Sequence, residues 1–121
     1  MKMFRKDEGF TLVELMVVVL IIGILVAIAI PVFGAAKGSA QKRACQGNQR
    51  TVEGAYKTYE ADVGPDVADA AVNDATTLWA ALVGNDKYVK VEPTCDGGGT
   101  YTWVDADDEL TCSLAAHPHY N

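Results

Sequence analysis

The carboxylate of Glu14 is the side chain whose position in the sequence points most directly to chemistry. It lies inside an apolar segment that begins at Phe10 and contains one other polar residue, Thr11, before Lys37. A charged group within a segment of membrane-spanning length is costly to insert, so it is usually retained for a function. We therefore predict that Glu14 binds a partner.

The three cysteines form the second group of reactive side chains. Cys95 begins the turn 97–99, which leads into an expected hairpin, and Cys112 ends the second strand of that hairpin. We predict a disulfide between these two, closing an 18-residue loop and contributing on the order of 3 kcal/mol in the chain-entropy model. Cys45 would then be a small buried apolar residue. Connectivity is not readable from sequence, so Cys45 could instead pair with Cys95 or Cys112.

Other polar clusters carry weaker signals. Asp105, Asp107 and Asp108 could offer oxygens to calcium, but their run lacks the spacing of a known calcium loop, so we predict a solvated turn. His117 and His119 could take up a transition metal, although a frayed tail is the expectation near a chain end. Because no pairing of nucleophile and base and no phosphate-binding loop is visible, the sequence predicts no enzyme, no cofactor and no metal.

A membrane-spanning helix is the element that must position Glu14. Residues 15–36 are 22 consecutive positions without a charge, and about 20 suffice to cross a bilayer core as a helix. A buried core helix would need more surrounding structure than 121 residues provide. A secretory signal cut after Ala29 is a further alternative, but an acidic residue inside the apolar region is unusual for such a signal.

The residues around Glu14 form a specific arrangement. A short basic leader, 1–9, ends in Gly9; Phe10 follows directly, Glu14 stands four positions later, and Pro31 interrupts the apolar run. This arrangement resembles the class III signal of type IV pilins and type II secretion pseudopilins. The resemblance implies that a prepilin peptidase cleaves between Gly9 and Phe10 and methylates the new amino terminus of Phe10.

Such cleavage would create a partner for the carboxylate. The new amine on Phe10 would lie one helical turn before Glu14, and the two charges attract strongly in a medium of low dielectric constant. The resemblance implies that the pairing is made between subunits and sets the axial register of a filament. The alternative is that Glu14 lies at headgroup depth and is solvated there.

The helix is predicted to continue beyond the membrane segment 10–36 as an amphipathic stretch over 37–63. Residues spaced by three and four positions define its expected inner face: Ala44, Asn48, Val52, Ala55, Tyr56, Tyr59 and Val63. Gly64 and Pro65 end it. Pro31 and Gly34 predict a kink or local melting, and in related filaments this region is stretched.

The remaining residues, 64–121, are too few for a large core, so this head must pack on the helix and be fastened covalently. Asp74 is a plausible N-cap for a short helix through Val83. Residues 100–104 and 109–113 predict an antiparallel hairpin. The predicted fold class is α+β: a long amino-terminal helix, half transmembrane and half amphipathic, with a small antiparallel sheet head closed by a disulfide, as in type IV pilins.

The predicted head and the amphipathic part of the predicted helix carry net charges of opposite sign. The chain carries a net charge of −6; residues 37–57 contribute +4 and residues from Tyr59 onward −10. The acidic head would repel nucleic acid, so direct nucleic acid binding is not expected.

The sequence therefore predicts a structural subunit of a type IV pilus-like or type II secretion pseudopilus filament. The resemblance implies a homo-oligomeric helical filament, with a prepilin peptidase, a platform protein and an assembly ATPase as partners. It also places the leader in the cytoplasm, one pass through the cytoplasmic membrane, the head outside, and the mature filament in the periplasm or the extracellular space. The competing prediction is a membrane-tethered or secreted binding protein that does not polymerise.

Overall fold

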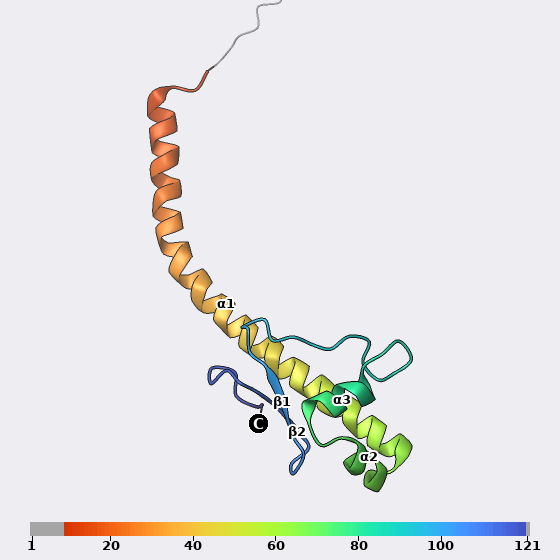
Figure 1. Cartoon of the computed structure of the whole chain (residues 1–121). Helices are drawn as coiled ribbons and strands as arrows, with labels where there is room; N and C mark the ends of the chain where they lie inside the picture. Colours follow the sequence, from red (N-terminus) through yellow and green to blue (C-terminus); the bar gives the residue numbers. More distant parts are fainter. Residues whose placement is uncertain (1–8, 121) are drawn as a thin grey trace, which may run out of the picture. The chain divides into compact units, whose positions relative to one another are not determined.

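The computed structural model describes residues 9–120 and divides after Ala36 into two compact units. Figure 1 shows the elements in chain order: α1 (Leu12–Val63), α2 (Pro65–Ala71), α3 (Ala75–Leu82), β1 (Tyr101–Val104) and β2 (Glu109–Cys112). The predicted α+β class, with a long amino-terminal helix and a small antiparallel sheet, is confirmed.

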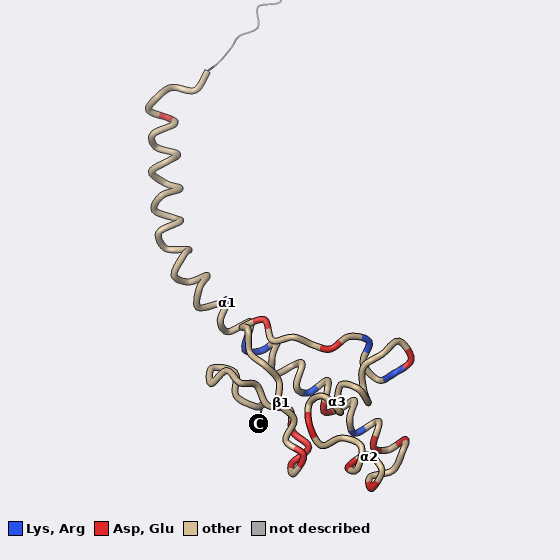
Figure 2. Tube along the Cα trace, in the orientation of Figure 1, with Lys and Arg blue, Asp and Glu red and all other residues tan. Residues whose placement is uncertain are grey.

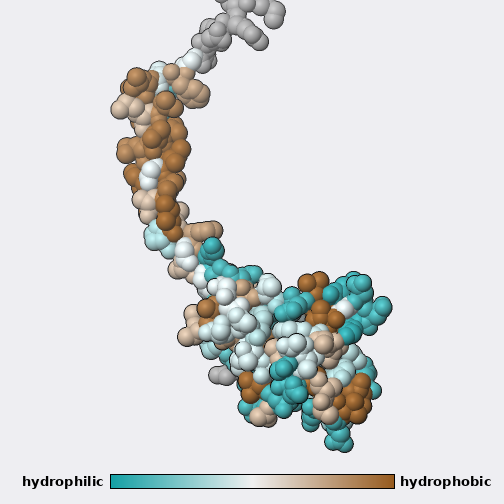
Figure 3. All heavy atoms as spheres, viewed as in Figure 1, coloured by the Kyte–Doolittle hydropathy of each residue, from teal (hydrophilic) through white to brown (hydrophobic). Residues whose placement is uncertain are grey.

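In the first unit, α1 carries mostly apolar side chains on the face that Figure 3 shows. Each large apolar side chain from Phe10 to Phe33 is exposed, and even the most covered, Val26, keeps 46% of its surface accessible. An 18-residue window of this helix has a mean hydropathy of 3.2 and is 0% buried, so its length and composition suffice to cross a membrane. A helix with no polar face requires an apolar environment or partner helices.

The backbone of α1 remains helical through Pro31. A kink or local melting at Pro31 and Gly34 stays a prediction, based on the backbone donor that proline removes there. Apart from the adjacent helix backbone, a Cβ atom added at Gly23, Gly34 or Gly38 would meet no atom of residues 9–120 within 4 Å. Packing within this chain therefore does not explain these glycines, each of which weakens a helix relative to alanine.

In the second unit, α1 buries one stripe of side chains at spacings of four, three and four: Cys45, Gln49, Val52 and Tyr56. The predicted face included Ala44 and Asn48 in place of the first two. Ala44 is exposed and Asn48 is half-buried, so the prediction was wrong by one position at this end. The periodicity could not identify the buried side because a buried glutamine does not stand out as apolar.

Gln49 has no hydrogen-bond partner for either side-chain polar atom among residues 9–120 and is 0% exposed. A buried amide without partners loses its hydration without compensation. We expect Gln49→Leu to raise the free energy of unfolding by about 1–3 kcal/mol. Urea unfolding of the detergent-solubilised chain measures this, with Lys42→Leu on the exposed surface of α1 as the control; a lower urea midpoint for Gln49→Leu would contradict it.

Local signals define the helices of the head. Gly64 ends α1 with a φ of 93°, a conformation that favours glycine, and its N–H donates to the carbonyl of Glu60. Pro65 then begins α2, which was not predicted. Asp74 caps α3 as predicted: it accepts from the Thr77 N–H at 2.7 Å, and the Thr77 hydroxyl accepts from the Asp74 N–H, completing a capping box.

The predicted hairpin is confirmed as an antiparallel pair in which Tyr101 lies opposite Cys112 and Trp103 opposite Leu110. Tyr101, Trp103 and Leu110 are buried in the core of the head. The centroids of the Trp103 ring and of the Tyr56 ring on α1 lie 4.8 Å apart. The core of the head joins α1, α2, α3 and both strands through the following buried residues: Cys45, Val52, Tyr56, Ala68, Val72, Leu78, Leu82, Cys95, Tyr101, Trp103 and Leu110.

Candidate functional site

The first candidate site is the start of α1. The Thr11 N–H donates to Oε2 of Glu14 at 2.8 Å, and the Thr11 hydroxyl donates to the same oxygen at 2.9 Å. In return the Glu14 N–H donates to the Thr11 hydroxyl at 3.2 Å. This reciprocal arrangement is a capping box, in which a threonine and a glutamate three positions later satisfy backbone donors at a helix start.

Sequence reasoning assigned no role to Thr11, although the spacing Thr-x-x-Glu ahead of an apolar run was a sufficient signal. The capping box gives Glu14 a role inside a single chain as well as the predicted role between chains. It holds the carboxylate at the exposed helix end, where the positive pole of the helix favours a negative charge. The carboxylate is therefore oriented before any partner arrives.

Gly9 and Phe10 precede the first helical residue, Leu12. The side chain of Phe10 is 87% exposed. The peptide bond between Gly9 and Phe10 thus lies outside regular structure, which is the conformation a peptidase can accommodate. The rest of the predicted leader, 1–8, lies outside the described residues, and cleavage, methylation and assembly at these positions remain predictions.

The two functions of this segment can be separated by Thr11→Val. This change removes the hydroxyl that contacts Glu14 but leaves the carboxylate in place. We expect faster amide hydrogen exchange over the first turn of α1 in detergent micelles, with filament assembly reduced but not abolished. Thr11→Ser, which keeps the hydroxyl, is the control; unchanged exchange in Thr11→Val would show that the capping box does not hold the helix start.

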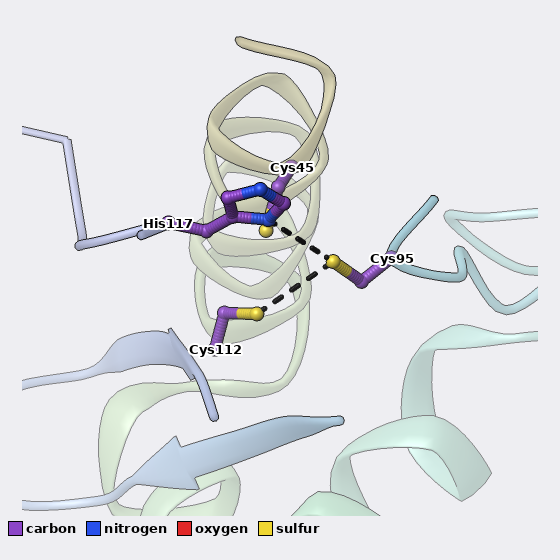
Figure 4. Close-up of side chains that lie close together, drawn as sticks. All are labelled: Cys45, Cys95, Cys112 and His117. Carbon is purple, nitrogen blue, oxygen red and sulfur yellow. Dashed lines mark hydrogen bonds between the residues drawn. The ribbon is translucent and has the colours of Figure 1, made fainter. Parts of the chain in front are cut away.

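The second candidate site is a cluster of cysteines and a histidine in the head (Figure 4). Cys45 comes from α1, Cys112 from the end of β2, Cys95 from the loop before the hairpin and His117 from the carboxyl-terminal segment. The Sγ atoms of Cys95 and Cys112 lie 3.7 Å apart, compared with about 2.05 Å in a disulfide. All three cysteines are free thiols, so the predicted disulfide is not confirmed.

The electrostatic environments of these thiols differ. Burial is the main reason that the pKa of Cys45 rises to about 12. Burial also acts to raise the pKa of Cys95, but hydrogen bonds from the Gly99 N–H, His117 and the Gly97 N–H outweigh it and hold this pKa at about 7. The Cys95 thiol therefore ionises more readily than the Cys45 thiol.

The carboxyl-terminal tail packs against α1, so the expectation of a frayed tail was wrong. His119 lies 2.8 Å from Oε1 of Glu53, and the Tyr120 hydroxyl donates to the other oxygen of the same carboxylate. The Gln46 amide also donates to the Pro118 carbonyl at 3.3 Å. One half-buried glutamate thus holds two aromatic side chains of the tail.

The acidic hairpin turn binds a lysine. Lys57 of α1 lies 2.6 Å from Oδ2 of Asp108 and 2.9 Å from Glu60. Two further acidic residues, Asp66 and Asp69, lie in α2 (Figure 2). The Lys57 ammonium thus partly balances the charge of Asp108, and the other two aspartates, Asp105 and Asp107, are exposed. That this turn binds no calcium stays a prediction.

The amino-terminal segment matches a known family model, and a larger part of the chain matches a known protein. The model of the prokaryotic N-terminal methylation motif matches residues 4–30. The chain is 32% identical to the competence protein ComGC of Bacillus subtilis over 93 residues, which cover 77% of this chain and 85% of that protein.

Other relatives match most of the chain. It is 36% identical to the type IV narrow pilus major component PilA5 of Thermus thermophilus over 120 residues, covering 92% of this chain and 81% of the relative. It is 31% identical to the type II secretion system core protein G of Vibrio cholerae over 119 residues, covering 94% and 82%. No solved structure matches the chain significantly.

Proposed function

Because this chain belongs to the family of type IV pilins and type II secretion pseudopilins, we propose that it is an abundant filament subunit that polymerises through the apolar half of α1. As a member of this family, the chain is a structural filament subunit with a prepilin-type amino terminus. The observation that carries the proposal is the exposure of every large apolar side chain from Phe10 to Phe33 in the single chain. Relatives named as a pilus major component and a secretion core protein support an abundant role.

The apolar half of α1 needs two successive environments. Before assembly, lipid covers it, because an unpartnered apolar helix of this length is stable in a bilayer. During assembly, neighbouring helices replace the lipid. At Gly23, Gly34 and Gly38 an added Cβ atom would meet no other part of the described residues 9–120 within 4 Å. These glycines allow close approach of another helix, as small residues do in helix packing within membranes.

Charge pairing sets the register of this packing. The helix-to-helix contact is apolar and by itself weakly specific for axial position, whereas an amine and a carboxylate in low dielectric attract strongly, and most strongly in the register that brings them together. We infer that Glu14 of one subunit neutralises the methylated amine of Phe10 on its neighbour. An unpaired charge at this depth is costly, which disfavours every other register.

Membership of the pilin and pseudopilin family also implies the proteins that process and assemble this subunit. A prepilin peptidase removes the leader after Gly9 on the cytoplasmic side, and a platform protein with an assembly ATPase lifts the subunit out of the membrane. The head stands outside the cytoplasm throughout. Pro31 and Gly34, where the helix lacks a backbone donor and a side chain, are the proposed positions of local melting on entry into the filament.

Mass spectrometry of sheared or periplasmic filaments tests this function. Filaments built from a species that begins at methylated Phe10 support it. A soluble species beginning at Ile30 would instead identify a secreted binding protein. A full-length species that keeps residues 1–9 and remains monomeric in native membranes would identify a tethered protein that does not polymerise, and either result would refute the proposal.

A further inference from the structure

We propose that Cys45, Cys95, Cys112 and His117 bind a single zinc ion in a tetrahedral site that fastens the head to α1. One ligand atom from each residue takes part, and these four atoms all lie within 4.8 Å of one another. The four residues come from four separate segments of the second unit (Figure 4). All four residues lie in the second unit, so the site does not involve the apolar residues 10–36 of the first unit.

The distances within the cluster fit one ion. At a zinc–sulfur distance of about 2.3 Å, two thiolates of a tetrahedron lie about 3.8 Å apart, and a thiolate and an imidazole nitrogen about 3.5 Å apart. The Sγ atoms of Cys95 and Cys112 are 3.7 Å apart, and Sγ of Cys95 lies 3.3 Å from Nδ1 of His117. These two edges are therefore close to those of a metal-centred tetrahedron.

Burial indicates a structural site. Cys45 is 0% exposed, His117 5% and Cys95 7%, while Cys112 is half-buried. A closed set of four protein ligands leaves no open position for substrate, as in structural zinc sites of the three-cysteine, one-histidine type. Soft sulfur ligands together with imidazole select zinc over the hard cations calcium and magnesium.

Two glycines beside the cluster supply a separate observation. A Cβ atom at Gly99 would lie 2.6 Å from Sγ of Cys112, and one at Gly97 would lie 2.6 Å from Cε1 of His117. Neither position therefore tolerates a side chain without displacing a proposed ligand. The loop 97–99 therefore brings its backbone directly against the proposed ligands.

The zinc site accounts for all four residues, whereas a disulfide accounts for two. A bond between Cys95 and Cys112 would leave the buried Cys45 thiol and the buried His117 ring without a function. Zinc binding involves no oxidant: three thiols lose their protons, the imidazole binds in its neutral form, and the ion joins four segments. A domain of this size commonly requires such a metal or covalent staple to be stable.

The first experiment measures zinc in the full-length chain, purified in detergent from its own membrane without chelator. We expect about one zinc ion per chain and, on replacement by cobalt(II), the intense visible absorption of a tetrahedral thiolate complex. His117→Gln should weaken zinc binding by more than about 100-fold, beyond the usual loss for an outer-shell partner. His119→Gln, two residues away, is the matched control and should retain the ion.

The second experiment uses the unaltered chain, so it does not depend on whether a variant folds. Thiol alkylation without reductant should leave all three cysteines unmodified in the zinc-loaded protein and modify all three after a chelator is added. Modification of Cys45 alone, with Cys95 and Cys112 released only by a reductant, would establish the disulfide and overturn the proposal. A reduced chain that fails to bind stoichiometric zinc, or a His117→Gln variant that binds as tightly as the unaltered chain, would also overturn it.

Discussion

We expect cells that carry Glu14→Ala to make normal amounts of membrane-inserted protein but at least about tenfold fewer filaments, because the methylated amine of Phe10 loses its counter-ion on the neighbouring subunit. Insertion should be unimpaired, since removing a charge from an apolar segment lowers its cost in the bilayer. The measurements are immunoblotting of membranes for the subunit and electron microscopy of sheared or periplasmic filaments.

Two companion variants separate charge from helix capping. Glu14→Gln keeps an oxygen that can accept from the Thr11 N–H, as Oε2 of Glu14 does, but removes the negative charge. We expect it to assemble as poorly as Glu14→Ala, whereas Thr11→Val, which keeps the carboxylate, should assemble better than either. Filaments of normal number and length from Glu14→Gln would exclude charge pairing as the source of register.

We expect Tyr56→Ala to lower the free energy of unfolding of the head by about 3–5 kcal/mol, the usual cost of truncating a large buried aromatic residue. Tyr56 is 0% exposed, its ring lies 4.8 Å from that of Trp103, and its hydroxyl donates to Asp69 at 3.2 Å. It therefore joins α1 to β1 and to α2. Because whole domains are stable by only about 5–15 kcal/mol, this variant should be close to unfolding.

Urea unfolding of the detergent-solubilised chain, followed by tryptophan fluorescence, measures the loss. Tyr56→Phe is the matched control: it keeps the ring contact and removes only the hydrogen bond, so it should cost about 0.5–1.5 kcal/mol. An unchanged urea midpoint for Tyr56→Ala would show that the contact between α1 and the hairpin does not hold the head together.

Local sequence signals were sufficient for the main elements. Asp74 capped α3, Gly64 ended α1 and the strands of the hairpin alternated as predicted, because each of these features depends on residues within a few positions of one another. The helix α2 was missed because its seven residues carry little apolar periodicity. Helix packing also buries Gln49, which no propensity rule would place in a core.

The cluster of three cysteines and His117 was predicted only in part. Cys95 and Cys112 frame one hairpin, so their proximity could be inferred from the turn and the strand pairing between them. Cys45 and His117 join them only because a particular face of α1 meets the hairpin and the tail folds back on the same helix. The contacts that α1 makes with the hairpin and the tail join residues separated by 50 positions or more, and no pattern in the chain encodes them.

The amino-acid sequence by itself determined the membrane-length helix, the acidic residue near its start and the processing signal before it, because composition and short spacings suffice for each. The tertiary structure alone decided the state of the head: which side of α1 is buried, that the tail binds Glu53, and that three thiols and an imidazole converge. The physical reason is that burial selects one packing of distant segments from many that local preferences allow equally.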